Sequence, residues 1–194
     1  MGKLDGACGY LSGPMDFVKD HGVKWRREFI RLVDQVGLNI DLIDPTDKPG
    51  GENVQIGENK AYQQKLQEMG WFKTLQEYVH HYRRFDLRYV DNSDFLVAVV
   101  DSTVPQWGTS NEVYVAETAH HPRFFVCDGG LRNLPRWLFD VIDDIREDNT
   151  SNVYQSIEEV VVELVALDNG VKPLSDEWVL IRKDIEERRT RRRR

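Results

Sequence analysis

Residues 94–100 read Asp-Phe-Leu-Val-Ala-Val-Val, a nearly continuous run of apolar and β-branched side chains. A strand that faces solvent on one side alternates apolar and polar residues, whereas a strand that is covered on both sides does not. We therefore expect this run to be the central strand of a sheet that is buried on both faces.

Segments with strand and helix patterns alternate on both sides of this run. Before it, apolar residues recur at helical spacing from Trp25 to Val36, and Gly37 follows where a helix favours a glycine. After it, Ser156 and Glu159 form a capping box that opens a further helix. The expected strands are 7–11, 38–43, 94–100, 122–127 and 152–155, and the other expected helices are 60–69, 72–90 with a break near Phe85, 108–119, and one from Ser175.

This alternation predicts an α/β protein, because parallel strands need crossover connections and helices usually provide them. A chain of 194 residues is long enough for one compact core. We expect a single-domain doubly wound parallel sheet of about five strands, flavodoxin-like or Rossmann-like, over residues 1–170. A C-terminal helix and a basic tail are expected over 171–194.

The charge distribution argues against general nucleic-acid binding. The chain carries a formal net charge of −7, although six arginines lie at its C-terminus: Arg188, Arg189 and Arg191 to Arg194. The rest of the chain is therefore strongly acidic and would repel a phosphate backbone. The arginine run itself has two interpretations, an arm for RNA, DNA or an acidic partner, or a disordered or expression-derived tail.

No apolar window reaches the length of a membrane span, and the N-terminus lacks the features of a signal peptide. We therefore expect a cytoplasmic protein without membrane contact. Cys8 and Cys127 lie inside apolar strands, without the short spacings of zinc sites, and are expected to be reduced and buried.

Common cofactor and hydrolase motifs do not occur. The chain contains no GxGxxG after its first strand, no GxxxxGK[ST], no HExxH and no GxSxG. The pairs His80-His81 and His120-His121 are adjacent residues, which point in different directions on a helix and do not converge on one metal. We expect neither a cofactor nor a metal.

Carboxylates near the carboxyl ends of the strands are the strongest candidates for chemistry, because ligands of parallel sheets bind there. Glu112 stands in the first turn of an expected helix, whose N-terminus stabilises an anionic nucleophile. The alternative is a capping box formed by Thr109 and Glu112, which needs no catalysis. Tyr10 could orient a carboxylate or be a core aromatic, and Asp86 could be an acid partner or a surface charge.

Three segments together resemble the nucleoside 2-deoxyribosyltransferases and the related deoxynucleoside monophosphate N-glycosidases. They are Tyr10–Met15 (YLSGPM), Asp86–Asp94 (DLRYVDNSD) and Gly108–Ala116 (GTSNEVYVA), and the similarity covers roughly residues 7 to 127. The resemblance implies that Glu112 is the nucleophile, that Asp86 is the acid that handles the base, and that Tyr10 holds the glutamate. It also implies a covalent 2-deoxyribosyl-enzyme and a homo-oligomer in which a neighbouring subunit closes the site.

The expected substrate contacts come from two loops, one after the first strand and one after the central strand. The Ser12-Gly13-Pro14 turn could present donors to a 5′-hydroxyl or 5′-phosphate. Arg26, Arg27 and Arg88 are interpreted as helix-surface charges, so a phosphate has no clear partner. Many members of the family carry an acid at the position of Gln106, which puts sugar recognition in question. The full set is Ser12, Gly13, Pro14, Met15, Asp16, Asp101, Gln106, Trp107, Gly108 and Thr109.

The sequence thus predicts an enzyme that transfers or hydrolyses the 2-deoxyribosyl group of a deoxynucleoside or its 5′-monophosphate, with a small nucleoside or nucleotide as its ligand. The alternative is a non-catalytic nucleotide-binding module with the same fold.

Overall fold

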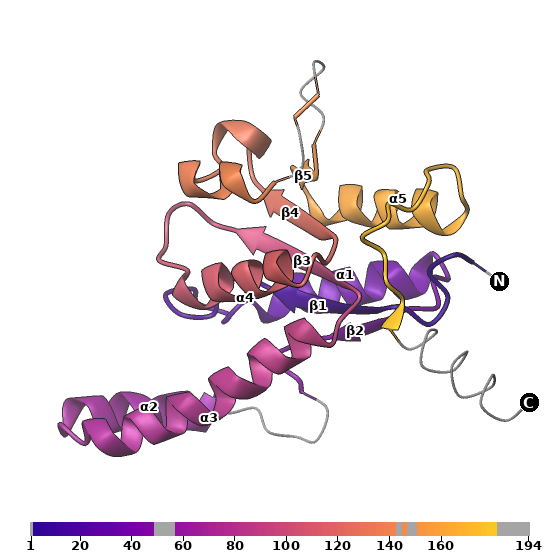
Figure 1. Ribbon diagram of the computed structural model, residues 1–194. Coiled ribbons are helices and arrows are strands. Elements are labelled where there is room, and N and C mark those ends of the chain that lie inside the picture. Colours follow the sequence, from indigo (N-terminus) through magenta and orange to yellow (C-terminus); the bar gives the residue numbers. More distant parts are fainter. Residues whose placement is uncertain (1, 49–56, 143–144, 147–150, 182–194) are drawn as a thin grey trace, which may run out of the picture.

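The computed structural model describes residues 2–48, 57–142, 145–146 and 151–181. Its centre is a five-stranded sheet in the order β2-β1-β3-β4-β5, in which every neighbouring pair is parallel (Figure 1). This is the strand order of flavodoxin-like folds, so the predicted fold class is confirmed. The strands are β1 (Cys8–Ser12), β2 (Asp41–Ile43), β3 (Phe95–Val100), β4 (Arg123–Cys127) and β5 (Val153–Tyr154).

Helices cover both faces of the sheet (Figure 1). One face carries α1 (Val23–Gln35) and α5 (Ile157–Asp168), and the other carries α3 (Phe72–Asp91) and α4 (Trp107–Thr118). Helix α2 (Gly57–Glu68) pairs with α3 in a hairpin that projects from the sheet, and two short 3-10 helices, η1 (Gly130–Arg132) and η2 (Arg136–Asp140), follow β4.

Strand β3 separates the two cores. Phe95 and Val97 pack in the core under α1 and α5, whereas Leu96 and Ala98 pack in the core under α3 and α4. Each of these four side chains is at most 1% exposed. Burial of both sets confirms that 95–100 is a central strand, as its uninterrupted apolar run indicates.

The C-terminal segment differs from its prediction. Residues 175–180 form a turn and extended chain, so the expected helix from Ser175 is wrong over these residues; residues 182–194, with the arginine run, lie outside the described part. Trp178 packs against Phe95 and Phe124, with ring centroids 5.5 Å and 6.1 Å away. Burial of this indole on the sheet holds the segment extended in place of a helix.

The two signals at helix ends are confirmed. The hydroxyl of Ser156 accepts a hydrogen bond from the backbone N–H of Glu159, as the capping box predicts. Gly37 has a φ of 74° directly after the C-cap of α1, which is the conformation that favours glycine there. Helix α3 runs through Phe85 without the expected break.

Both cysteines are buried and free thiols, in agreement with the sequence. Within the described ranges, none of the helices combines the length and the apolar character that a membrane span requires.

Two glycines give opposite predictions for stability. A Cβ on Gly9 would lie 2.3 Å from the ring of Phe95, whereas a Cβ on Gly108 in α4 meets nothing within 4 Å. We expect Gly9→Ala to lower the free energy of unfolding by about 1–3 kcal/mol through overpacking. Gly108→Ala should raise it by about 0.5–1 kcal/mol, because alanine favours the helix. Urea denaturation of both variants tests this, and an unchanged Gly9→Ala protein would contradict the packing of β1 on β3.

Candidate functional site

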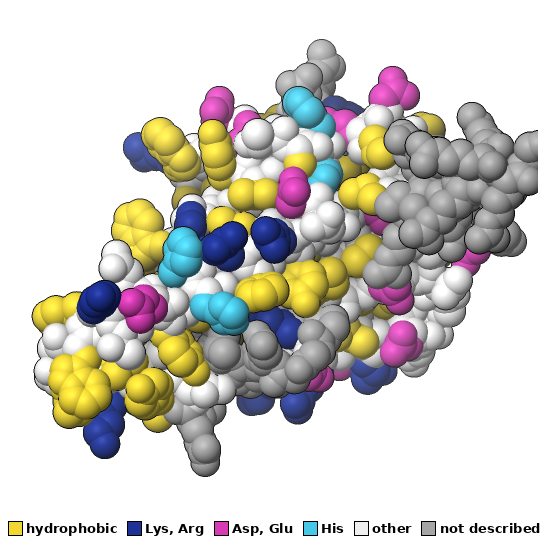
Figure 2. All heavy atoms as spheres, turned by 60° about the horizontal axis from the view of Figure 1, so that its bottom comes forward, with side chains coloured by type: hydrophobic (Ala, Val, Ile, Leu, Met, Phe, Trp, Pro, Cys, Tyr) yellow, Lys and Arg dark blue, Asp and Glu magenta, His cyan; other side chains and the backbone are white. Residues whose placement is uncertain are grey.

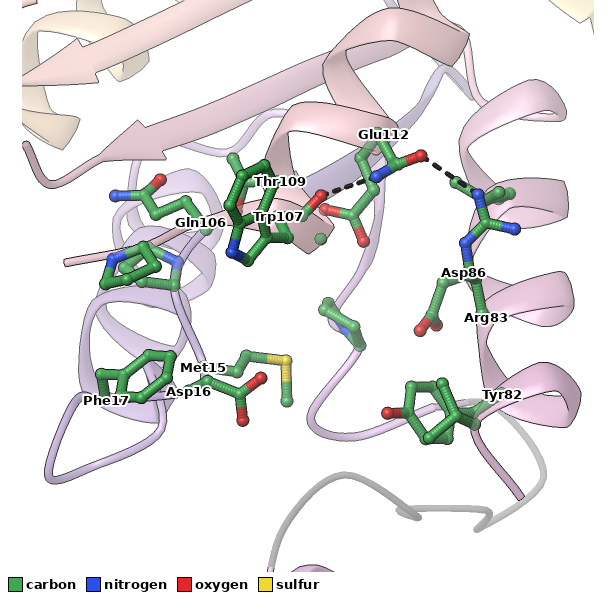
Figure 3. Close-up of a pocket in the computed structure, with 18 of the residues that line it drawn as sticks. Met15, Asp16, Phe17, Tyr82, Arg83, Asp86, Gln106, Trp107, Thr109 and Glu112 are labelled. Carbon is green, nitrogen blue, oxygen red and sulfur yellow. Dashed lines mark hydrogen bonds between the residues drawn. The ribbon is translucent and has the colours of Figure 1, made fainter. Parts of the chain in front are cut away.

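A pocket of about 310 Å³ opens at the carboxyl edge of the sheet. Its walls come from the loop after β1, the middle of α3 and the first turns of α4 (Figure 3). The pocket lies beside β1 and β3, where the strand order reverses and where ligands of such folds bind. Its volume falls in the range of small-molecule sites.

Glu112 reaches from α4 across to β1. The Tyr10 hydroxyl donates to Oε1 at 2.9 Å, and the Ser12 hydroxyl donates to Oε2. The N-cap of α4 is Gln106, which makes no side-chain capping hydrogen bond. Glu112 is therefore held by two hydroxyls of the neighbouring strand, and the alternative of a capping box with Thr109 does not describe this contact.

The surroundings of Glu112 oppose and favour its charge at once. Burial raises the pKa of the Glu112 carboxyl, and the nearby Asp86 carboxylate adds to the increase, while the Ser12 and Tyr10 hydroxyls and Arg26 act against it. Burial, with Glu112 next in importance, also raises the pKa of Tyr10 well above its ordinary value. Tyr10 thus stays protonated and remains a donor to the carboxylate.

Arg26 is a buried cation beneath this site. It is 0% exposed, which corrects its interpretation as a helix-surface charge. Its guanidinium donates to the carbonyls of Leu11 at 3.0 Å and Gly13 at 3.1 Å, and its Nε lies 3.7 Å from Asp44. It also donates to the carbonyl of Gly22 at 3.0 Å, so one rigid group binds both ends of the loop between β1 and α1.

Asp86 lines the opposite wall from α3. It is 6% exposed, and its Oδ1 lies 2.8 Å from Lys48 Nζ, so it is not a surface charge. Lys48 follows β2 and its side chain is only 4% exposed. Figure 3 shows the Asp86 and Glu112 carboxylates pointing into the same space from α3 and α4.

Most of the predicted substrate contacts do line this pocket, from Gly13 to Asp16 on one loop and from Gln106 to Thr109 on the other. Ser12 lies behind them on Glu112. Asp101 is not among the lining residues, because its carboxylate accepts the backbone N–H and hydroxyl of Thr103 at 2.9 Å and 2.5 Å. The side-chain amide of Gln106 donates to the Asp101 carbonyl at 2.7 Å, which braces this loop.

Sequence reasoning missed several residues of the site. Lys48 lies in a loop where no motif marks it, and Lys60 and Tyr82 sit on helices that were assigned no function. Lys60 Nζ contacts the Met15 carbonyl at 3.2 Å and Asp16 at 3.1 Å. Burial raises the pKa of Tyr82 to about 12, with smaller effects of Asp16 and Asp86. The one available signal was position, since Lys48 follows the carboxyl end of a strand.

Aromatic side chains frame the pocket mouth. Trp107 on α4 is 81% exposed and Phe17 after β1 is 73% exposed, and both line the pocket. Phe17 has a φ of 65°, a left-handed conformation that is costly for a residue with a side chain. Exposed rings at the mouth suit a planar ligand. Among the described residues, no group of three or more His, Cys, Asp or Glu side chains could hold a metal.

No protein-family model matches the chain, and no curated protein matches it. Among solved structures, the crystal structure of a conserved protein from Enterococcus faecalis V583 is similar, with 19% identity over 96% of this chain and 99% of that one, at a TM-score of 0.43.

The electrostatics of Glu112 predict a pH-dependent stability effect. Burial raises the pKa of Glu112 above the ordinary 4.5. The protonated carboxyl therefore does not destabilise the folded state at acid pH, whereas the charged form lowers the free energy of unfolding as pH rises through the folded pKa. Glu112→Gln should therefore unfold less easily than the wild type at pH 7, by about 1 kcal/mol. This gain should shrink toward pH 4.

Thermal unfolding of both proteins between pH 4 and pH 8 measures the difference. Glu77→Gln on the exposed side of α3 serves as the control for loss of one negative charge. A Glu112→Gln protein that is less stable than wild type at pH 7, or equally shifted at every pH, would contradict the burial of a charged carboxylate.

Proposed function

We propose that this protein cleaves the N-glycosidic bond of a 2-deoxyribonucleoside by attack of Glu112 on the sugar C1′. The observation that carries the proposal is the Glu112 carboxylate, which faces a pocket while Tyr10 and Ser12 bind its two oxygens. A carboxylate that is oriented by hydroxyls and partly desolvated is suited to form a covalent sugar intermediate. The resemblance to deoxyribosyltransferases points to the same residue.

The proposed reaction has two steps with two carboxylates. Glu112 forms an ester bond to C1′ through an oxocarbenium-like transition state, and the electron pair of the C1′–N bond leaves with the base. Asp86, on the facing wall, passes a proton to the departing base. A second base or a water molecule then attacks C1′, loses a proton to Asp86 and releases Glu112, so the configuration at C1′ is retained.

The cations of the pocket favour an unphosphorylated substrate. Arg26 is used by backbone carbonyls, and Lys60 pairs with Asp16. Arg83 donates to the Asn111 side chain at 3.1 Å. A 5′-phosphate would have to displace one of these contacts, whereas a 5′-hydroxyl would not. We therefore favour a deoxynucleoside over its monophosphate.

We also propose that the protein acts in the cytoplasm as a homo-oligomer that assembles through the α2–α3 hairpin. Hydrophobic side chains gather over the outer part of this hairpin (Figure 2), where Met69, Trp71 and Phe72 are 49%, 53% and 66% exposed. Exposed apolar groups that lie together are typical of protein interfaces, and a two-fold axis would pack the same patch of two copies together. Sedimentation of the double variant Trp71→Ser/Phe72→Ser should show dissociation, and an unchanged mass would refute this interface.

The nucleophile is tested by trapping with a 2-fluoro-2-deoxynucleoside, whose fluorine slows release of the sugar more than its attachment. Intact-protein mass should increase by one fluorodeoxyribosyl group, and peptide mapping should place that group on Glu112. Glu112→Gln should form no adduct and lose at least about 10³-fold in activity, while Tyr10→Phe should keep the adduct but form it more slowly. An adduct on another residue would overturn the assignment.

Product analysis separates the two forms of the activity. Incubation of common deoxynucleosides with and without a second base distinguishes transfer, which requires the acceptor, from hydrolysis, which does not. A nucleoside that raises the melting temperature without any turnover would instead support the non-catalytic binding module.

A further inference from the structure

Lys48 is a buried lysine that pairs with Asp86 beside the pocket. Its ammonium lies 2.8 Å from Asp86 Oδ1, and the two side chains are 4% and 8% exposed. It also lies 5.9 Å from the ring centroid of Tyr82. Burying an ammonium or a carboxylate destabilises a fold unless the two are paired. Even a paired ammonium and carboxylate often stabilise a protein no more than apolar residues of similar size do. A requirement other than stability would explain why this pair is present.

The chain places Lys48 with a rigid turn. Asp44 directly follows β2 and accepts hydrogen bonds from the backbone N–H and the hydroxyl of Thr46, both at 2.7 Å. The Asp47 N–H donates to the Asp44 carbonyl at 3.0 Å, and Asp44 in turn faces Arg26. The turn is therefore anchored to the same buried arginine that fixes the loop after β1. From this turn, the Lys48 side chain reaches Asp86 on α3.

The order of groups at this wall is pocket, Asp86, Lys48. Asp86 belongs to the described lining of the pocket and Lys48 does not. Among the described residues, the Asp86 carboxylate therefore stands between the Lys48 ammonium and the pocket. An aspartate that pairs with a lysine is ionised, so it has no proton of its own to give to a leaving base.

We propose that Lys48 is a positioning residue that stores the proton which Asp86 hands to the departing base. This inference rests on the proposed function. When the C1′–N bond breaks, its electron pair leaves with the base, and the base takes a proton from Lys48 by way of Asp86. Lys48 becomes a neutral amine and Asp86 stays ionised. The water or acceptor base that attacks the sugar ester then loses a proton to Asp86, and that proton restores the Lys48 ammonium.

The arrangement also serves the nucleophile. The Asp86 carboxylate is close enough to Glu112 to disfavour the charge of Glu112, which the reaction needs. An ammonium at Asp86 offsets this repulsion. Glu112 and Asp86 thus each have a buried cation nearby, Arg26 for Glu112 and Lys48 for Asp86.

Three full-length variants separate proton supply from charge. Lys48→Arg keeps the positive charge, but a guanidinium does not release a proton. Lys48→Met removes the charge and leaves Asp86 to take up a proton by itself. Lys73→Arg, on an exposed part of α3, is the matched control for a lysine-to-arginine exchange.

Two substrates give the readout. One is the common deoxynucleoside that the wild type cleaves fastest, and the other is the same nucleoside with a methylated ring nitrogen, whose cationic base leaves as a neutral molecule and needs no proton. We expect Lys48→Arg to lose about 10²–10⁴-fold in kcat with the ordinary substrate and less than about 10-fold with the methylated one. Lys48→Met should retain activity with the ordinary substrate only at acid pH, where Asp86 is protonated.

Other outcomes count against the proposal. If Lys48→Arg cleaves the ordinary substrate like the Lys73→Arg control, Lys48 supplies charge alone. If Lys48→Arg is folded by its melting temperature but loses both substrates equally, it does not act through the proton. A wild-type protein that cleaves neither substrate and forms no Glu112 adduct would refute the proposed function itself, which keeps the two failures apart.

Discussion

The buried guanidinium of Arg26 is the contact on which the site depends. It joins the end of β1, the start of α1 and the turn after β2, because it binds the carbonyls of Leu11, Gly13 and Gly22 and faces Asp44. These are the segments that position Ser12 against Glu112 and Lys48 against Asp86. An uncharged side chain could not bind so many carbonyls, and an unpaired cation could not remain buried, so the two walls of the pocket share one electrostatic anchor.

The fold was largely predictable from the sequence because its strongest signals are local. The apolar run 95–100, the capping box at Ser156 and the glycine after α1 each report a backbone state that neighbouring residues determine. The segment from Ser175 was assigned the wrong state because Trp178 packs on β3 and β4, which lie more than fifty positions earlier in the chain. Long-range burial of this kind leaves no periodic pattern nearby.

The site was predictable where motifs mark it and not where only space brings residues together. Glu112, Tyr10 and Asp86 were identified as a group; Glu112 and Asp86 line one pocket with most of the two expected loops, and Tyr10 binds Glu112 from behind it. Arg26 was predicted to be exposed, because the sequence pattern around a buried arginine on a helix does not differ from that around an exposed one. Lys48 was missed because its partner lies on α3, and no sequence pattern links a loop lysine to a carboxylate on a distant helix.

The packing of Trp178 also bears on how the chain is made. Asp94 accepts the N–H groups of Cys8 and Ile181 at 2.7 Å and 2.6 Å, so one carboxylate ties the first strand to the segment that carries Trp178. During synthesis from the N-terminus, the strands emerge long before this closing segment does. Until it arrives, Phe95 and Phe124 lack their indole cover. A chain that is still being synthesised therefore carries an incomplete core on this face of the sheet until Trp178 is added.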